Sequence, residues 1–327
     1  MNTNQLKSQQ RKSLSIWDKK SAKQLSNVAE LQDVVFLHIQ KASEFDIDFS
    51  LFPAVQELWI SSKQDYQIPN SFLELQQLDK FILGTNCFLS ENIHLLNNLR
   101  ELWLEEEGIL NPPYNIRKSE SIRELHILGS LNFFPSSAPE WIFEMPRVEK
   151  IRFSVCRFTS ISEKINQLVN LVDLDLGCSL SDLEMFPNLS GLTKLRCLDV
   201  SGESVQGQKL PPYPLFPQVL ESIKMLKDLE YLNLSWWRPK KKTEWLVVDN
   251  KRHSIPEIFD RYPHLKELSL GGMKLDFLPS TVFELKNLKY LNILDNNLDS
   301  DEVKKVIQRL PDCRIDSDVV CYKPKLK

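Results

Sequence analysis

The chain has 327 residues, of which 42% are hydrophobic and 26% charged, and its formal net charge is −3. This composition excludes disordered and collagen-like chains, and the small charge gives no reason to expect a nucleic-acid or membrane partner. No apolar run approaches the roughly 18 residues that span a bilayer, and the polar start of the chain lacks the apolar segment of a signal peptide. The 6 cysteines have no paired spacing, so we expect reduced thiols, a cytoplasmic location and no transmembrane segment.

Residues 1–30 form a predicted basic arm. Six Lys or Arg residues precede Ala29, and Asp18 is the acid among them. Trp17, Leu25 and Val28 favour a short helix that caps the first repeat. The basic residues are either solvated or face an acidic surface.

One short pattern, L-x-x-L-x-L with Val, Ile or Phe also allowed at the apolar positions, recurs over residues 31–312. Its eleven copies begin at Val34, Val55, Leu78, Leu99, Ile122, Val148, Leu171, Leu195, Leu229, Leu265 and Leu288. Most starts lie 21 to 26 residues apart, and two steps are longer, at 34 and 36 residues. The alternation at the end of each copy predicts a short strand, and the following residues suffice for a helical turn and a return. One such unit cannot bury its apolar face alone, so the copies must stack.

This repeat resembles that of the leucine-rich-repeat family, in its short intracellular form. The copy from Leu288 to Leu298 carries the family's Asn as Asn296, and a Leu-Pro pair at Leu278-Pro279 precedes Phe283. Elsewhere the Asn position is filled by Asn86, Cys156, Ser179, Glu203, Trp237 and Met273. The expected fold is an α/β leucine-rich-repeat solenoid, a horseshoe with a concave parallel β-sheet and short helices or 3₁₀ turns on its convex side.

Two neighbouring repeats carry predicted insertions, at 201–228 and 235–256. The first contains a Pro-rich stretch around Phe216, and the second contains Trp236, Trp237, Trp245 and Lys240–Lys242. Such loops often form part of a binding face, which here would suit an anionic surface of lipid headgroups or RNA. The alternative is that Phe216, Trp237 and Trp245 pack over the side of the solenoid while the lysines are solvated.

The C-terminal part is predicted to form a helix followed by a strand. Acidic residues begin the segment Asp299–Leu310 and Arg309 ends it, which predicts a helix with Asp299 or Ser300 as its N-cap. The stretch Pro311–Ile315 is typical of a final edge strand, and we assign 313–327 to a cap strand and tail. About a dozen residues follow the strand, so we expect no appended catalytic domain.

The residue between the last two apolar positions of each copy points out of the predicted sheet. In order these are His38, Trp59, Ile82, Trp103, His126, Arg152, Asp175, Asp199, Asn233, Ser269 and Asn292. Strands stack at about 4.8 Å, so Trp59, Ile82 and Trp103 form an apolar stripe flanked by two histidines. Exposed aromatic residues in a concave face favour a partner site, unless the N-terminal arm or a loop covers them.

The second half of this face is acidic. Asp173, Asp175 and Asp199 lie together, with Cys197 beside them and Tyr231 and Asn233 beyond. The central inner positions hold eight acids against Lys80, Lys150 and Arg152, with Glu57, Glu101, Glu105, Glu124 and Glu267 as the other acids. This charge opposes nucleic acid and favours a protein that presents Lys or Arg, or it serves solubility alone.

Catalytic and metal-binding patterns are weak. A Cys197–His126 nucleophile pair would be separated by three strands, roughly 14 Å at the strand spacing. The five histidines lack metal-ligand spacing, and Gly271-Gly272 lacks the Lys of a phosphate loop. Asp175 and Asp199 are close enough to share Ca²⁺ or a proton, but paired carboxylates on a solvated sheet usually do neither. We expect no enzyme, no cofactor and no metal.

The sequence therefore predicts a monomeric, non-catalytic scaffold or adaptor that binds a protein partner through its concave face. The alternatives are the anionic-surface site of the second insertion and, from the resemblance alone, a regulatory subunit of a phosphatase or small GTPase. The predicted partner-binding residues are Trp59, Ile82, Trp103, Glu101, Glu105, His126, Arg152, Asp173, Asp175, Asp199, Tyr231, Asn233 and Trp236.

Overall fold

The computed structural model describes residues 12–105, 109, 112–129, 137–202, 213–237, 247–249, 252–319 and 321–322. The chain divides into two compact units, unit 1 (Met1–Ile127) and unit 2 (Leu128–Lys327). Residues 1–11 of the predicted arm lie outside the described residues. The same holds for 203–212 in the first predicted insertion and for 238–246, 250 and 251 in the second. Within the described part, no helix has the length and apolar character needed to cross a bilayer.

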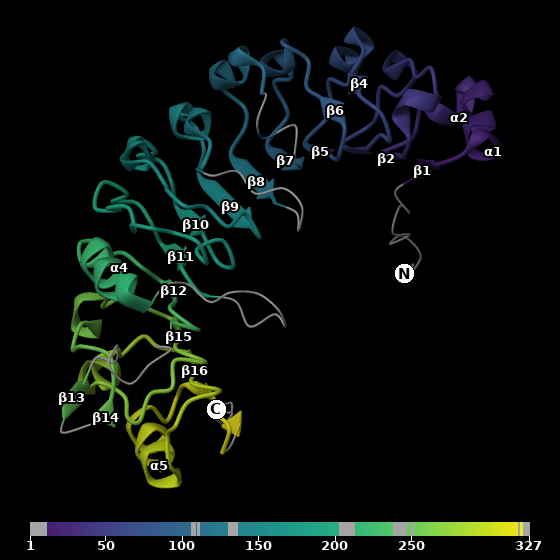
Figure 1. Cartoon of the computed structure of the whole chain (residues 1–327). Helices are drawn as coiled ribbons and strands as arrows, with labels where there is room; N and C mark the ends of the chain where they lie inside the picture. Colours follow the sequence, from purple (N-terminus) through teal and green to yellow (C-terminus); the bar gives the residue numbers. More distant parts are fainter. Residues whose placement is uncertain are drawn as a thin grey trace, which may run out of the picture. The chain divides into compact units, whose positions relative to one another are not determined.

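Strands that follow one another in chain order form the sheet of unit 1 (Figure 1). They are β1 (Ser13–Ile16), β2 (Phe36–Ile39), β3 (Glu57–Ile60), β5 (Lys80–Leu83), β7 (Glu101–Glu105) and β8 (Glu124–Leu128). The pairs β1–β2, β2–β3, β3–β5 and β5–β7 are parallel. Two short strands, β4 (Tyr66–Gln67) and β6 (Cys87–Phe88), make a separate parallel pair.

Short helices return the chain from one strand of unit 1 to the next. They are α1 (Lys19–Ala22), η1 (Lys23–Ser26), α2 (Val28–Leu31), η2 (Ala42–Glu44), η3 (Phe49–Leu51), η4 (Asn70–Glu74), η5 (Ile93–Leu95) and η6 (Tyr114–Lys118), where η marks a 3₁₀ helix. Trp17 and Val28, expected to cap the first repeat, are 51% and 46% exposed. It is β1 that extends the sheet beyond the first repeat, with Leu14 and Ile16 buried.

Unit 2 repeats the same plan. Its sheet strands are β9 (Lys150–Ser154), β10 (Asp173–Asp175), β11 (Cys197–Asp199), β12 (Tyr231–Asn233), β15 (Glu267–Ser269), β16 (Tyr290–Asn292), β17 (Arg314–Asp316) and β18 (Cys321–Tyr322). Neighbours from β9 to β17 pair in parallel. An antiparallel pair, β13 (Val247–Asp249) with β14 (Arg252–His253), falls within the second predicted insertion.

The helices of unit 2 lie on one side of its row of strands (Figure 1). They are η7 (Glu140–Glu144), η8 (Glu163–Gln167), η9 (Tyr213–Leu215), α4 (Phe216–Ile223), η11 (Phe259–Arg261), η12 (Ser280–Glu284) and α5 (Ser300–Arg309). The N-cap of α5 is Asp299, whose carboxylate accepts from two backbone N–H groups, as predicted. The predicted edge strand needs correction, because β17 is covered on its outer side by the antiparallel strand β18.

The core follows the alternation of the repeat. The apolar residues of each strand point inward, so Leu58, Leu102, Leu174 and Leu268 are fully buried. Except for Ser269, which is buried, their outward neighbours on the strands are half-buried or exposed, because the side-chain period of a strand is two. The predicted strand-and-return unit is confirmed in both units, and it fixes which side chains the strand face can offer.

Side chains at the Asn position of the repeat tie one copy to the copy before it. Asn296 Nδ2 donates to the carbonyl of Leu270 at 2.9 Å. Ser179 Oγ makes the equivalent bond to the carbonyl of Phe153 at 3.1 Å. Both acceptors belong to the last apolar residue of the preceding strand pattern, so Ser can take the place of the family's Asn.

Trp237 occupies the same position and makes the same kind of bond. Its indole Nε1 donates to the carbonyl of Val200 at 2.6 Å, and its ring centroid lies 5.6 Å from that of Phe216. Both aromatic side chains are fully buried. Phe216 and Trp237 therefore pack within the protein, as the alternative interpretation of the insertions predicted. Trp237 is not available to bind an anionic surface.

Candidate functional site

In unit 1 the outward side chains of neighbouring strands form the predicted row. The strand registers place Trp59 opposite Ile82 and Ile82 opposite Trp103. The His38 ring stacks on Trp59, with centroids 4.3 Å apart and planes 14° apart. At the other end Trp103 stacks on His126, at 4.0 Å and 7°. The predicted order of side chains is confirmed, and each tryptophan has one ring face covered by a histidine.

A charged row runs beside these rings. Lys80 Nζ lies 3.7 Å from Glu57 Oε1 and 3.4 Å from Glu101 Oε1. The same ammonium lies 5.0 Å from the centroid of the Trp103 ring, within the range of a cation–π interaction. Trp103 Nε1 donates to Glu101 Oε1 at 2.5 Å. Lys80 and Glu101 therefore fix the orientation of Trp103, while Trp59 stays 37% exposed.

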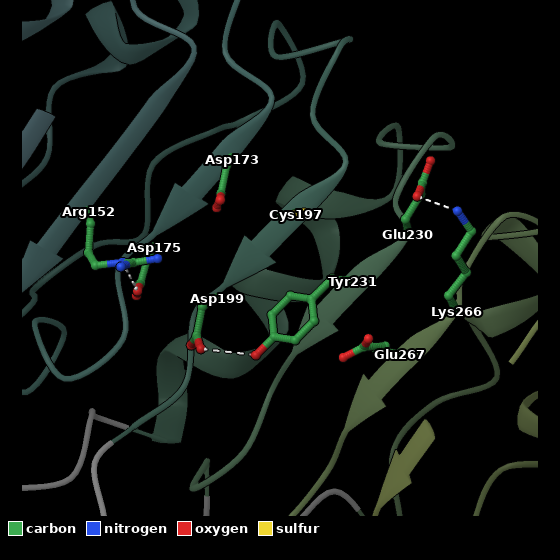
Figure 2. Close-up of a pocket in the computed structure, with 9 residues that line it drawn as sticks. All are labelled: Arg152, Asp173, Asp175, Cys197, Asp199, Glu230, Tyr231, Lys266 and Glu267. Atoms are coloured by element: carbon green, nitrogen blue, oxygen red, sulfur yellow. Dashed lines mark hydrogen bonds and ion pairs between the residues drawn. The ribbon is translucent and has the colours of Figure 1, made fainter. Parts of the chain in front are cut away.

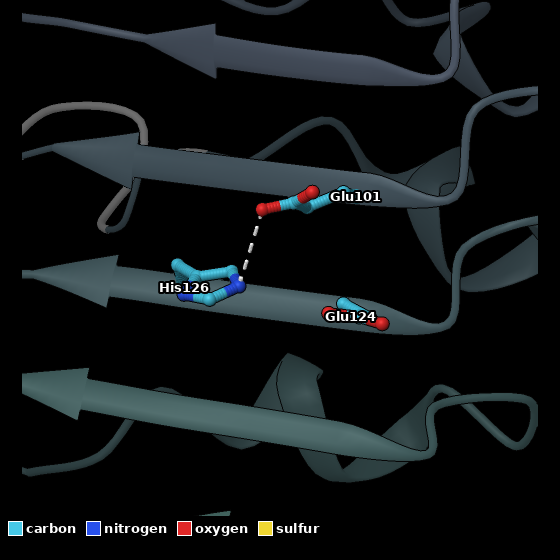
Figure 3. A group of neighbouring side chains, drawn as sticks. All are labelled: Glu101, Glu124 and His126. Atoms are coloured by element: carbon cyan, nitrogen blue, oxygen red, sulfur yellow. Dashed lines mark ion pairs between the residues drawn. The ribbon is translucent and has the colours of Figure 1, made fainter.

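Figure 3 shows Glu101, Glu124 and His126, whose ligand atoms lie within 4.8 Å of one another. Two carboxylates and an imidazole are a donor set that Zn²⁺ accepts. His126 is 7% exposed, and its Nε2 lies 3.5 Å from Glu101 Oε1. Because Glu101 already accepts from Trp103 and faces Lys80, a metal ion would have to displace these donors. The cluster fits polar support of the Trp103–His126 stack better than it fits a metal site.

In unit 2 the same outward position holds charged and amide side chains in a row. The registers place Arg152 opposite Asp175, Asp175 opposite Asp199, and Asp199 opposite Asn233, as predicted. Arg152 Nε donates to Asp175 Oδ2 at 3.0 Å. Asn233 Nδ2 donates to Asp199 Oδ2 at 2.7 Å. Neighbouring strands are thus linked across the face through side chains.

These side chains also end their own strands. The Oδ1 atom of each accepts a hydrogen bond from the backbone N–H two residues later: Asp175 from Gly177 at 2.9 Å, Asp199 from Ser201 at 2.8 Å, Asn233 from Ser235 at 3.1 Å and Asn292 from Leu294 at 3.1 Å. Asp and Asn favour this side-chain turn because their short side chains reach the local backbone. One oxygen of each carboxylate therefore has a structural use, and Oδ2 is the oxygen turned to the strand face.

A pocket of about 370 Å³ opens over this row (Figure 2). It is lined by Arg152, Asp173, Asp175, Cys197, Asp199, Glu230, Tyr231, Lys266 and Glu267. Five of these are acids and two are bases, so the formal charge of the lining is −3. Both bases are ion-paired, Arg152 with Asp175 at 3.0 Å and Lys266 with Glu230 at 2.6 Å. Three further acids line the pocket beyond these two pairs.

Burial sets the protonation of the pocket's central groups. Burial, and then the neighbouring carboxylate of Asp199, raise the pKa of Asp175 to about 6. Burial and nearby acids also raise the pKa of the Tyr231 hydroxyl and of the Cys197 thiol. At neutral pH the phenol and the thiol therefore keep their protons, and a protonated thiol is a poor nucleophile. The lining suits recognition of a cationic group, with Asp175 changing charge near pH 6.

Comparisons with known proteins agree with this architecture. An internalin from Listeria monocytogenes superposes over 94% of this chain and 78% of its own, with a TM-score of 0.53 and 16% identity. A chain of the Toll–Spatzle complex of Drosophila superposes over 86% of this chain and 35% of its own, with a TM-score of 0.56 and 16% identity. Both have the strand-and-return repeat described above. The chain has the leucine-rich-repeat fold.

Curated proteins also resemble this leucine-rich-repeat chain in sequence. The human volume-regulated anion channel subunit LRRC8D is 26% identical over 243 residues, which are 64% of this chain and 27% of that protein. Mouse LRRC8B, a subunit of the same kind of channel, is 25% identical over 68% of this chain and 25% of its own length. The leucine-rich-repeat chain thus spans about a quarter of the length of the curated relatives it matches. No family model matches it.

The second insertion of the leucine-rich-repeat chain is split between described and undescribed residues. Trp236, a predicted site residue, is half-buried with φ +71°, and its ring lies against Gly272. Trp245 and Lys240–Lys242 lie outside the described residues. With Trp237 buried, the anionic-surface alternative loses one of its three tryptophans.

Four pocket residues of the leucine-rich-repeat chain are absent from the predicted partner-binding residues: Cys197 and Glu267, which were placed on the acidic face, and Glu230 and Lys266, which were not placed on it. Glu230 and Lys266 lie directly before β12 and β15, at the second position of L-x-x-L-x-L, and they pair with each other. The prediction used the residues within the strands, and this position lies one residue before each strand. An acid and a base at the same position of consecutive copies is the signal that could have found them, because the two side chains lie about 4.8 Å apart across parallel strands.

Proposed function

We propose that the chain is a non-catalytic scaffold or adaptor that binds a protein partner through its strand face. The observation that carries this proposal is the row Trp59–Ile82–Trp103 on neighbouring strands of unit 1. The core of a repeat protein does not need tryptophan at outward positions, yet Trp59 keeps 37% of its surface exposed. Large aromatic side chains dominate the energetics of protein interfaces, so this row is the proposed anchor.

The acidic pocket of unit 2 supports a partner with a basic surface. Its lining has five acids and two bases. Such a surface steers an oppositely charged partner into contact and rejects acidic proteins, so its main effects are on association rate and specificity. Asp173, Asp175, Asp199, Tyr231 and Asn233 are the proposed contact residues.

A cytoplasmic location fits the cysteines. Five of the cysteines are present as thiols outside any disulfide: Cys87, Cys156, Cys178, Cys197 and Cys313. Burial raises the pKa of Cys156 to about 11 and that of Cys313 to about 12, so both stay protonated at neutral pH. Reduced, unreactive thiols are usual in a reducing compartment.

The test is a quantitative pull-down from native lysate with the wild type and a Trp59→Ala/Trp103→Ala variant, followed by titration of the captured protein. Loss of each anchor should weaken the purified complex by about 2 kcal/mol or more. Trp17→Ala is the matched control, because Trp17 is 51% exposed but lies outside the row. Equal affinities for all three proteins would refute the proposal.

A second measurement addresses the acidic pocket. Asp199→Asn keeps the oxygen that accepts from Ser201 N–H while it removes the charge. The on-rate should fall and should depend less on salt, because screening acts on the charge alone. An on-rate with the same salt dependence in both proteins would remove this role.

A further inference from the structure

In the row Trp59–Ile82–Trp103 of unit 1, an aliphatic residue separates the two tryptophans. The outer faces of Trp59 and Trp103 are covered by His38 and His126. Ile82 stands between the two indoles, one strand from each. At the strand spacing the two tryptophans are about 9.6 Å apart, with a shorter aliphatic side chain between them. An apolar side chain of a partner can therefore rest on Ile82 and against the inner side of Trp59, while the Lys80 ammonium lies over the Trp103 ring.

Lys80 is an example of a cationic side chain bound on this surface. Its ammonium sits at 5.0 Å from the Trp103 ring and within ion-pair distance of Glu57 and Glu101. These two carboxylates share one ammonium, so the three groups together carry a formal charge of −1. The arrangement combines an indole ring with acids on adjacent strands, and only the Trp103 side of it is filled by Lys80.

The Trp59 side offers the same chemistry with more exposure. Trp59 is 37% exposed, and Glu57 lies two residues before it on β3, on the same face. Among the described outward residues of β3, β5 and β7, the charged groups are Glu57, Glu101 and Glu105 against Lys80. The face is therefore complementary to a segment that carries positive charge next to an apolar side chain.

We propose that the unit 1 face binds a segment of a partner protein in which a bulky apolar residue is followed or preceded at two positions by Lys or Arg. The apolar side chain packs on Ile82 between Trp59 and Trp103, and the basic group lies against Trp59 and Glu57. The two-residue interval comes from the sheet: Glu57 and Trp59 are two residues apart, about 6.6 Å, which an extended segment matches with alternate side chains. This inference rests on the proposed function and specifies its partner.

The probe is a displayed library of random 15-residue peptides, selected on the full chain and counter-selected on Trp59→Ala/Trp103→Ala. Clones that depend on the row should be enriched in an apolar residue with Lys or Arg at two positions from it. A synthetic peptide of one such clone, titrated by fluorescence anisotropy, should bind Trp59→Ala about thirty-fold more weakly and Trp17→Ala unchanged. Glu57→Gln should weaken it several-fold and flatten its salt dependence.

The outcomes separate this inference from the proposed function. Row-dependent clones that are acidic, or that lack the apolar residue, overturn the chemistry while protein binding through the row still stands. A selection with no row-dependent clone overturns the inference, and the lysate titration then decides on the proposed function alone. Clones captured only after Lys7→Glu/Arg11→Glu also overturn it, because the chain's own basic arm would then be the occupant. Self-association that Trp59→Ala abolishes would do the same in favour of a second copy.

Discussion

Trp237 gives the most direct test of how these repeats are held together. Its indole is fully buried, its Nε1 donates to the carbonyl of Val200 at 2.6 Å, and its ring packs on Phe216. One side chain thus fills space and replaces the Asn of the repeat. Trp237→Phe removes the donor and part of the ring, and Trp237→Ala removes both functions.

The two variants differ in expected cost. Deleting a buried tryptophan down to Ala costs about 3–5 kcal/mol, because apolar contacts are lost and a cavity remains. For Trp237→Phe, a buried carbonyl that loses its donor costs about 1–3 kcal/mol. The smaller ring adds roughly 1 kcal/mol of lost apolar burial. We therefore expect Trp237→Phe to lose about 2–4 kcal/mol of unfolding free energy.

Urea unfolding followed by far-ultraviolet circular dichroism measures this effect without relying on tryptophan emission. A loss of this size lowers the midpoint by about 1 M or more at the usual urea dependence of unfolding free energy. Trp17→Phe is the control, since Trp17 is 51% exposed and its variant should stay within about 0.5 kcal/mol of wild type. A Trp237→Phe midpoint equal to that of Trp17→Phe would refute the assigned role of the indole N–H.

Three more outcomes follow from single contacts. Gly272→Ala should cost about 1–3 kcal/mol, because Gly272 has φ +68° and a Cβ there would lie 2.4 Å from the Trp236 ring; a urea midpoint no lower than that of Gly271→Ala, whose nearest contact is 3.1 Å, would contradict this. The pKa of folded Asp175, about 6, lies above its unfolded value, so ionisation costs the folded state more. The unfolding free energy of Asp175→Asn minus that of the wild type should therefore increase from about pH 4 to about pH 7, by at most about 3 kcal/mol. If urea titrations give the same difference between the two proteins at every pH, the result would count against the buried carboxylate. Ser179→Ala should cost about 1–3 kcal/mol, because this buried hydroxyl donates to one backbone group and accepts from another; a midpoint unchanged in urea would show that neither bond stabilises the fold.

The repeat pattern was sufficient to predict the strands and the order of side chains along the strand face. A period of two within each strand and a constant register between copies fix which residues become neighbours, so Trp59, Ile82 and Trp103 fall in one row. Asp175 and Asp199 are adjacent for the same reason. These predictions needed no knowledge of side-chain conformation, only the spacing of the apolar residues.

Predictions outside the regular pattern were less successful, because they depend on side-chain geometry. The stretch around Trp237 does not tell whether its indole is buried or exposed, since an aromatic residue precedes it, a charged residue follows it, and the copy is longer than most others. The indole Nε1 of Trp237 donates to the carbonyl of Val200, which belongs to the preceding copy and lies 37 residues away in sequence. The antiparallel strand β18 over β17 was missed similarly, because its residues follow no repeat.

The strand face also shows why charge alone is an incomplete guide to binding residues. Asp175 and Asp199 each use Oδ1 to end a strand, and this use would select Asp or Asn at the position with or without a partner. Asn233, in the next strand, has the same turn without the charge. The structural role therefore accounts for the residue type, and only the negative charge requires a second explanation. The exchange of Asp for Asn at these positions consequently keeps the oxygen that ends the strand while it removes the charge, whereas substitution by Ala removes both.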